Sequence, residues 1–174
     1  MSDTASTSQG EARRLAALGR YEILDTPREA TFDRVVDIIA AVFDVPIAMI
    51  TFVDRDRSWY KSELGMGVPE MPRTDNMCDT TIAQDGVLVI SDANLAPREQ
   101  VLPLLKKGLR FYAGAPLRTR DGVKLGTVCA VDVRPREVTE KEKLIAELFH
   151  LVKDAPYDDT LIHEQAVRAG RSRE

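Results

Sequence analysis

Two apolar runs near the middle of the chain, joined by a short polar turn, constrain the fold more than any other feature of the sequence. The runs cover residues 110–117 and 124–132, and the turn between them contains Asp121 and Gly122. An Asp-Gly pair between two β-type runs is typical of a tight connection between antiparallel strands. The pattern therefore predicts a hairpin near the centre of a sheet, on which the rest of the chain packs.

Further runs of strand length precede this hairpin. Residues 47–53 are apolar almost throughout, which predicts a central strand covered on both faces. Residues 58–62 predict a more amphipathic strand after it, and residues 87–90 a short one. Residues 65–75 carry Gly, Pro and charge without periodicity, so we expect a long loop there.

The strongest helix start lies at Thr26, where three signals coincide. Thr26 can cap the helix, Pro27 suits its first position, and Glu29 can reach back to the N–H of the cap. The apolar residues that follow at helical spacing are Phe32, Val35, Val36, Ile39, Ala40 and Phe43. They predict a helix with a wide apolar face against the sheet.

Weaker patterns predict helices at residues 11–19, 77–84, 97–107 and 139–152. Residues 1–10 are small and polar and are expected to be disordered. This order of elements predicts a single α+β domain at residues 11–153 with a mainly antiparallel sheet. Residues 154–174 are expected to form a tail or a short helix.

The overall composition argues against several classes of function. A net charge of −4 gives no general attraction for phosphate backbones, so nucleic acid is not an expected ligand. No apolar run approaches the roughly 20 residues that span a bilayer, and the N-terminus lacks the basic start and apolar core of a secretion signal. We therefore expect a cytoplasmic protein that does not enter a membrane.

Cys78 and Cys129 are the only cysteines, too few for a disulfide framework and without the spacing of metal ligands. At a helix N-terminus, Cys78 could have a lowered pKa and form a redox pair with Cys129. The pattern favours the simpler interpretation that both are small buried apolar residues. No set of nucleophile, base and oxyanion donors is evident, so no catalytic or metal-binding residues are predicted.

Several motifs, taken in order along the chain, resemble those of bacterial GAF domains in sensor histidine kinases and in cyclic-dinucleotide signalling proteins such as diguanylate cyclases. They are Tyr21-Glu22-Ile23-Leu24-Asp25-Thr26-Pro27, Phe32-Asp33, Pro46-Ile47-Ala48, Val53-Asp54-Arg55-Asp56-Arg57-Ser58-Trp59, Pro72-Arg73, Cys78, Asp92-Ala93, Arg110-Phe111-Tyr112-Ala113-Gly114-Ala115-Pro116-Leu117 and Leu125-Gly126-Thr127-Val128-Cys129. The resemblance spans Glu11 to about Val152.

This resemblance implies a six-stranded antiparallel sheet of the GAF or PAS type, with the N- and C-terminal helices on one face. Loops and short helices on the other face would enclose a small-molecule pocket. GAF domains usually sense or dimerise and signal through their terminal helices. The resemblance therefore implies a stand-alone module that acts as a homodimer, or docks in trans onto a signalling protein.

The resemblance does not identify the ligand or any cofactor. Thr80 stands where GAF domains of this group often carry a His, two residues after the cysteine. In photosensory GAF domains the bilin-binding Cys is commonly next to a His, whereas Cys78 is followed by Asp79, which disfavours a covalent bilin. His150, on the last predicted helix, and His163, in the tail, are poorly placed for haem.

The residues expected to contact a ligand are Trp59, Lys61, Cys78, Arg110, Phe111, Tyr112 and Cys129. Neighbouring strand residues point to opposite faces, so one aromatic of each pair, Trp59-Tyr60 and Phe111-Tyr112, should face the pocket and the other a helix. Lys61 or Arg110 could pair with an anionic ligand, whereas Asp54 and Asp92 are expected to cap turns.

Three functions follow as hypotheses. The favoured one is a non-enzymatic sensory module in signal transduction that binds a small molecule. The first alternative is a cysteine-dependent reductase of free methionine-R-sulfoxide, since some free-standing GAF proteins have this activity. The second is a dimerisation module with an empty pocket, whose terminal helices expose an apolar strip. The leucines that would form this strip are Leu15, Leu18, Leu144, Leu148 and Leu151.

Overall fold

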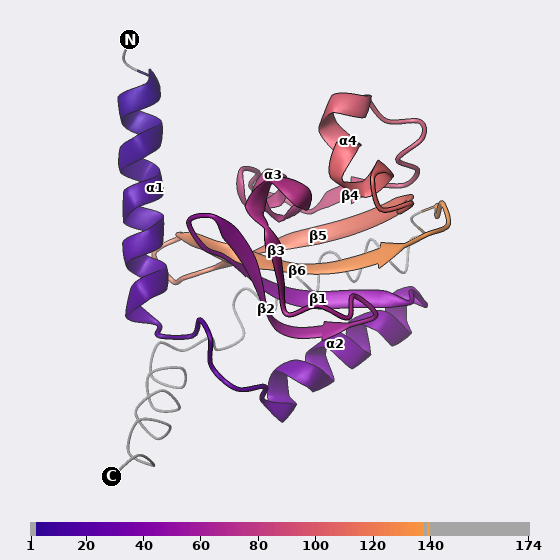
Figure 1. The fold of residues 1–174 in the computed structure, drawn as a ribbon, viewed down its shortest axis with the longest axis horizontal. Coiled ribbons are helices and arrows are strands. Elements are labelled where there is room, and N and C mark those ends of the chain that lie inside the picture. The colour runs from indigo at the N-terminus through magenta and orange to yellow at the C-terminus, as the bar shows by residue number, and fades with distance from the viewer. Residues whose placement is uncertain (1–2, 138, 140–174) are drawn as a thin grey trace.

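The computed structural model describes residues 3–137 and residue 139 of the chain. Its centre is a six-stranded antiparallel sheet with the strand order β3-β2-β1-β6-β5-β4 (Figure 1). The strands are β1 (Ile47–Val53), β2 (Arg57–Leu64), β3 (Glu70–Pro72), β4 (Leu88–Ile90), β5 (Phe111–Arg118) and β6 (Lys124–Asp132). The predicted α+β architecture is confirmed, and the predicted central hairpin is the β5–β6 pair.

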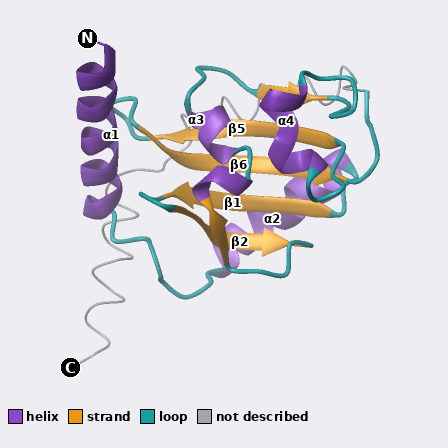
Figure 2. Cartoon of the chain, turned by 45° about the horizontal axis from the view of Figure 1, so that its top comes forward, coloured by secondary structure: helices purple, strands orange, loops and turns teal. Residues whose placement is uncertain are grey.

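Helices cover both faces of the sheet. They are α1 (Asp3–Arg20), α2 (Ala30–Phe43), η1 (Arg73–Asp75), α3 (Cys78–Ile82) and α4 (Arg98–Leu105). Figure 2 shows α3 and α4 in front of the sheet and α2 behind it, while α1 stands at one end of the strands. We call the two faces the α2 face and the cavity face.

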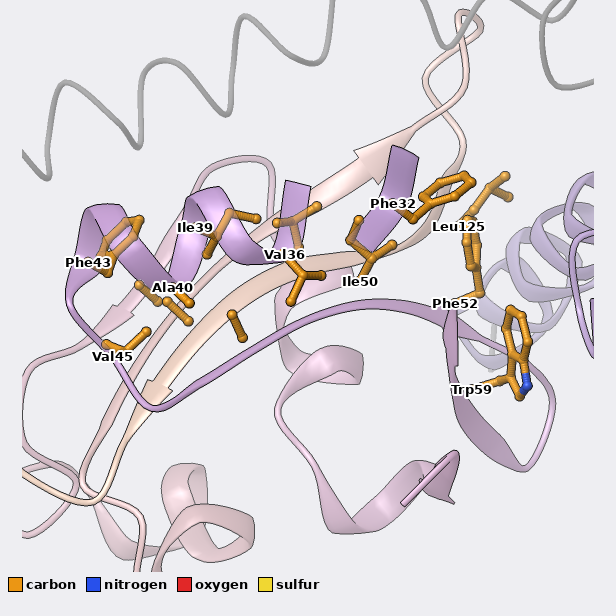
Figure 3. Packing of buried hydrophobic residues seen from close by; sticks show 14 of the residues in the cluster. Phe32, Val36, Ile39, Ala40, Phe43, Val45, Ile50, Phe52, Trp59 and Leu125 are labelled. Carbon is orange, nitrogen blue, oxygen red and sulfur yellow. The ribbon is translucent and has the colours of Figure 1, made fainter. Parts of the chain in front are cut away.

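The α2 face is packed with rigid aliphatic and aromatic side chains. Phe32, Val36, Ile39, Ala40 and Phe43 of α2 are all buried, as the helical spacing predicts. They pack in one cluster with Ile50, Phe52, Trp59 and Leu125 of the sheet, which Figure 3 also labels. Burying a large apolar side chain contributes about 1.5–3 kcal/mol. This face is therefore the main structural core, and Ala17 and Leu18 at the end of α1 belong to it.

Close contact between the two central strands depends on Gly126 in β6. A Cβ atom at this position would lie 1.9 Å from the carbonyl oxygen of Thr51 in β1. Any side chain would therefore push β6 away from β1. The Leu-Gly-Thr motif thus serves strand packing.

The start of α2 differs from the predicted capping box. Glu29, not Thr26, occupies the cap position, and no side chain caps the helix. Thr26 donates its hydroxyl to the carbonyl of Ile23, and both Thr26 and Glu29 contact the ammonium of Lys61. A buried ammonium has three N–H donors that need acceptors. The Thr26 hydroxyl and the Glu29 carboxylate, which would have formed the capping box, bind Lys61 instead.

Two other predictions were wrong. Helix α1 begins at Asp3 instead of Glu11, so residues 3–10, which were expected to be disordered, are helical. The reason is that adding a residue to an existing helix costs far less free energy than starting one. The expected loop at 65–75 contains β3, which pairs with the edge of β2, and η1. The predicted helix at residues 97–107 is α4, which continues past Pro103. The predictions for residues 140–174, including both histidines, lie outside the described residues.

Candidate functional site

A small cavity lies on the cavity face, between the sheet, α3 and α4. It is lined by Met49, Tyr60, Met66, Met71, Asp75, Asn76, Met77, Cys78, Pro103, Leu104, Lys107, Leu109, Tyr112, Cys129 and Val131. We call it the α3 cavity. Its volume of about 30 Å³ is room for about two water-sized atoms, at 10–15 Å³ each. An organic ligand would therefore require the walls to move.

Sulfur-containing side chains distinguish this cavity from the rest of the core. Met49, Met66, Met71 and Met77 line it together with both cysteines, whereas the hydrophobic cluster of the α2 face contains neither residue type. Methionine has three rotatable bonds and adapts to irregular spaces. The walls of the α3 cavity are thus more adaptable than the packing on the opposite face of the sheet.

Cys78 and Cys129 reach the cavity from different elements. Cys78 is the first residue of α3, and its backbone N–H donates to Oδ1 of Asn76 at 2.9 Å. Its Sγ accepts a hydrogen bond from the Thr127 hydroxyl at 3.3 Å. Thr127 and Cys129 are two residues apart in β6 and so share a face of the sheet. Both thiols are fully buried.

The two thiols affect each other's ionisation in opposite directions. Cys129 lies within hydrogen-bonding reach of Cys78 and lowers the pKa of that thiol; the Thr127 hydroxyl acts in the same direction and burial opposes both. The same contact with Cys78 raises the pKa of Cys129 well above its ordinary value, and burial raises it further. Cys78 is therefore the more acidic thiol of the pair.

Hydroxyl groups surround these thiols beneath α3. The hydroxyls of Tyr112 and Thr81 are 2.6 Å apart, and Thr81 donates its proton to the Met77 carbonyl, so Tyr112 donates to Thr81. The ring of Tyr112 lies over Gly114, where a Cβ atom would approach the hydroxyl oxygen to 2.2 Å. Burial raises the pKa of Tyr112, which keeps the phenol neutral. The Thr51 hydroxyl is buried without a hydrogen-bond partner among the described residues.

The structure separates the predicted aromatic pairs as strand alternation requires. Tyr112, a predicted site residue, and Tyr60 line the α3 cavity. Trp59 and Phe111 belong to the cluster on the α2 face, Trp59 as shown in Figure 3. They therefore lie on the opposite face of the sheet from the α3 cavity; the sequence pattern did not choose between the two faces. Among the predicted residues, Cys78, Tyr112 and Cys129 meet at one cavity.

Lys61 is fully buried on the side of α2, not at the α3 cavity. Its ammonium contacts Glu29, the Thr26 hydroxyl at 2.8 Å and the Pro27 carbonyl at 2.8 Å, and lies 5.2 Å from the centre of the Phe32 ring. It also lines an open groove of about 490 Å³ along β2. Its three donors are already used, so the predicted pairing of Lys61 with an anionic ligand is not supported.

Arg110 also has a structural partner. Its guanidinium pairs with the Asp92 carboxylate, with an Nε–Oδ1 distance of 3.0 Å. This hydrogen bond lowers the pKa of Asp92, whose carboxylate also accepts the N–H of Asn94 in the predicted turn. The pair fastens the segment after β4 to the start of β5. Arg110 therefore holds two elements together, away from the α3 cavity.

The sequence did not reveal an ionic connection between α1 and α3. Arg73 contacts Glu11 of α1 and, at 2.7 Å from its Nε, Asp79 of α3. Glu11 also accepts the Nε–H of Arg14 at 2.8 Å, and Arg14 donates to the carbonyl of Val53. Hydrogen bonds from Arg14 and Arg73 lower the pKa of Glu11 to about 2, against the effect of burial. We call Glu11, Arg73 and Asp79 the α1–α3 connection.

No three or more His, Cys, Asp or Glu side chains in the described part of the chain are grouped so that they could hold a metal ion. No described helix combines the length and the apolar character needed to cross a membrane.

Comparisons with known proteins agree with this fold. The family model of the GAF domain matches residues 27–151. The cyclic di-GMP phosphodiesterase PA2567 of Pseudomonas aeruginosa is 32% identical over 144 residues, which is 81% of this chain and 24% of that protein. The chain thus spans about a quarter of the length of this curated relative.

Solved structures with low sequence identity share the architecture. The GAF domain of an Acinetobacter phosphoenolpyruvate-protein phosphotransferase has a TM-score of 0.59 and 18% identity, covering 90% of this chain and 98% of that one. The free methionine-R-sulfoxide reductase of Neisseria meningitidis, in complex with its substrate, has a TM-score of 0.58 and 19% identity, covering 79% and 84%. These two likenesses show the fold alone. The family model covers most of the chain, and the chain belongs to the GAF domain family.

Proposed function

We propose that this GAF domain is a sensory module in signal transduction, in which the α3 cavity binds a small ligand and α1 carries the response. The observation that supports this most is the α1–α3 connection. Asp79 directly follows Cys78, a cavity residue, and Arg73 joins it to Glu11 of α1. A displacement of α3 by a ligand would pull on Arg73 and so on α1.

The position of α1 suits it to transmit a signal. Its last turns pack into the α2-face core, while its first turns extend past the end of the sheet (Figures 1 and 2). Leu18 is buried in that core and cannot join an exposed apolar strip, whereas Leu15 is half-buried. The extended part of α1 is the surface that we propose for dimerisation with a second copy or for docking onto a signalling partner.

The cavity walls define the class of ligand. Most of the lining is apolar or sulfur-containing, and Lys107 at the cavity already donates to the Asp75 carbonyl. Lys107 is the one cationic side chain among the described lining residues and Asp75 lies beside it, so burying an organic anion with more than one negative charge would be costly. We therefore propose a small ligand without a large negative charge, accommodated by movement of the methionines.

A second candidate function has one specific observation in its favour, because Cys78 and Cys129 lie in the same cavity. In a reductase of free methionine-R-sulfoxide, the two thiols would become a disulfide, the sulfoxide would become a thioether, and its oxygen would leave as water. An added thiol would then reduce the disulfide. Incubation with free methionine-R-sulfoxide and dithiothreitol tests this, and absence of turnover eliminates it.

Native mass spectrometry and sedimentation of the full chain at several concentrations test the sensory proposal. We expect a concentration-dependent dimer and an added small mass on a fraction of the chains. A strict monomer would contradict dimerisation, and docking of α1 onto a signalling partner would then be the remaining role of this surface. A dimer that never carries an added mass would favour the alternative of an interaction module with an empty cavity.

A further inference from the structure

All sulfur atoms of the described side chains gather around the α3 cavity. We infer that this cavity binds a soft monovalent metal ion, copper(I), through the sulfur atoms of Cys78, Cys129 and Met49. Copper(I) would then be the signal of the sensory module proposed above, and this consequence rests on that proposed function. The binding itself rests on the placement of the sulfur atoms.

Strand register brings two of the three sulfur side chains together. Met49 in β1 lies directly opposite Cys129 in β6. Both side chains line the cavity, and directly opposed residues have Cβ atoms about 4.5–5.5 Å apart. The thiol and the thioether therefore start from adjacent positions on one face of the sheet.

The third sulfur atom approaches this pair from above the sheet. The Sγ atom of Cys78 is 3.3 Å from the hydroxyl oxygen of Thr127, which is two residues from Cys129 on the same face of β6. The three sulfur atoms thus come from α3, β1 and β6. Helices and strands place metal ligands more precisely than loops do.

The size of the cavity selects an ion over a larger ligand. Its volume of about 30 Å³ suits an occupant of one or two atoms. The walls would have to rearrange widely for a nucleotide or a tetrapyrrole. A single ion with sulfur ligands requires only rotation of side chains that already line the cavity.

The chemistry of the three side chains selects the metal. Thiolate and thioether ligands prefer copper(I), whereas oxygen ligands suit magnesium, calcium and manganese. Each cysteine that binds as a thiolate forms a copper–sulfur bond and releases its proton to solvent, and copper remains in the +1 state. Thr127 already donates to the Cys78 sulfur. Thr51, opposite Thr127 in the register, offers a buried hydroxyl that has no partner within the described structure.

The test is an anaerobic titration of the reduced full chain with copper(I), supplied as its complex with the coloured chelator bathocuproine disulfonate. We expect the wild-type chain to withdraw one equivalent of copper(I). Cys78→Ser and Cys129→Ser should each weaken binding at least about a hundredfold, and Met49→Leu at least about tenfold, since even loss of a group that hydrogen-bonds a metal ligand lowers affinity about 10–100-fold. Met71→Leu is the matched control, because Met71 lines the cavity from β3, and its affinity should match the wild type.

Two results would overturn the inference. One is a wild-type chain that withdraws no copper(I), and the other is a Cys78→Ser/Cys129→Ser double variant that still binds one equivalent. Circular dichroism checks the fold of each variant. If a cysteine variant does not fold, the copper(I) affinities of Met49→Leu and Met71→Leu still test the inference. Equal affinities of these two variants would also overturn it. Failure here would leave the α1–α3 connection untouched, since none of its tests uses copper or changes a sulfur side chain.

Discussion

Removing the charge of Glu11 should destabilise the protein more than removing any charge from the exposed surface of α1. In Glu11→Gln, the side chain keeps its shape but no longer pairs as an anion with Arg14 and Arg73. A pKa lowered from the ordinary 4.5 to about 2 corresponds to about 3 kcal/mol, at 1.36 kcal/mol for each pKa unit. The side chain is 33% exposed, so solvent screening reduces the expected loss to about 1–2 kcal/mol.

The effect should depend on pH in a defined direction. A carboxyl group with a lowered pKa in the folded state stabilises the fold above its pKa in the unfolded chain. The difference in unfolding free energy between wild type and Glu11→Gln should thus be complete above about pH 5 and disappear as the pH falls toward 2. Urea unfolding at pH 7, 4 and 3 measures this difference.

Arg13→Gln is the matched control on the same helix. Arg13 pairs with Asp121, but the two side chains are 69% and 57% exposed. Such a surface pair contributes about 0.2–1 kcal/mol at most. Equal losses in Arg13→Gln and Glu11→Gln, or a loss in Glu11→Gln that does not change with pH, would refute the importance of the α1–α3 connection.

Three further changes test other parts of the structure. Lys61→Met should lower the unfolding free energy by about 1–3 kcal/mol, because the half-buried Glu29 carboxylate and the Pro27 carbonyl lose the ammonium; urea unfolding measures this loss, and a stability equal to wild type would show that Lys61 does not stabilise the fold through these contacts. Gly114→Ala should cost about 1–3 kcal/mol by displacing the Tyr112 ring, and an unchanged thermal midpoint would contradict this contact. Cys78 and Cys129 should resist a thiol reagent in the native protein and react after unfolding, so rapid reaction of the native protein would contradict their burial.

Elements whose signals are local in the sequence were predicted well. The apolar run that became β1, the hairpin around Asp121-Gly122 and the apolar face of α2 each depend on neighbouring residues. Alternation along β2 and β5 also predicted that each aromatic pair would divide between the faces. The sequence did not show which face held the α3 cavity, so it could not tell that Trp59 and Phe111 pack on the other face.

Features that depend on distant contacts were not predictable. The capping box at Thr26 failed because Lys61, 35 residues away in the sequence, contacts the same groups. The bond between Glu11 and Arg73 spans 62 residues and follows no sequence pattern. The four methionines of the cavity come from separate segments, so only the folded chain brings them together.

The central claim is that the α3 cavity and α1 respond together, and amide NMR under xenon pressure tests it most directly. Xenon enters apolar cavities without specific chemistry. We predict shifts in the amide signals of Cys78, Tyr112 and Cys129 and of the Glu11–Leu18 segment in wild type and in Arg13→Gln. In Glu11→Gln, the cavity signals should shift while those of α1 should not. Cavity shifts without any α1 response in the wild type, or no cavity shifts at all, would contradict the account.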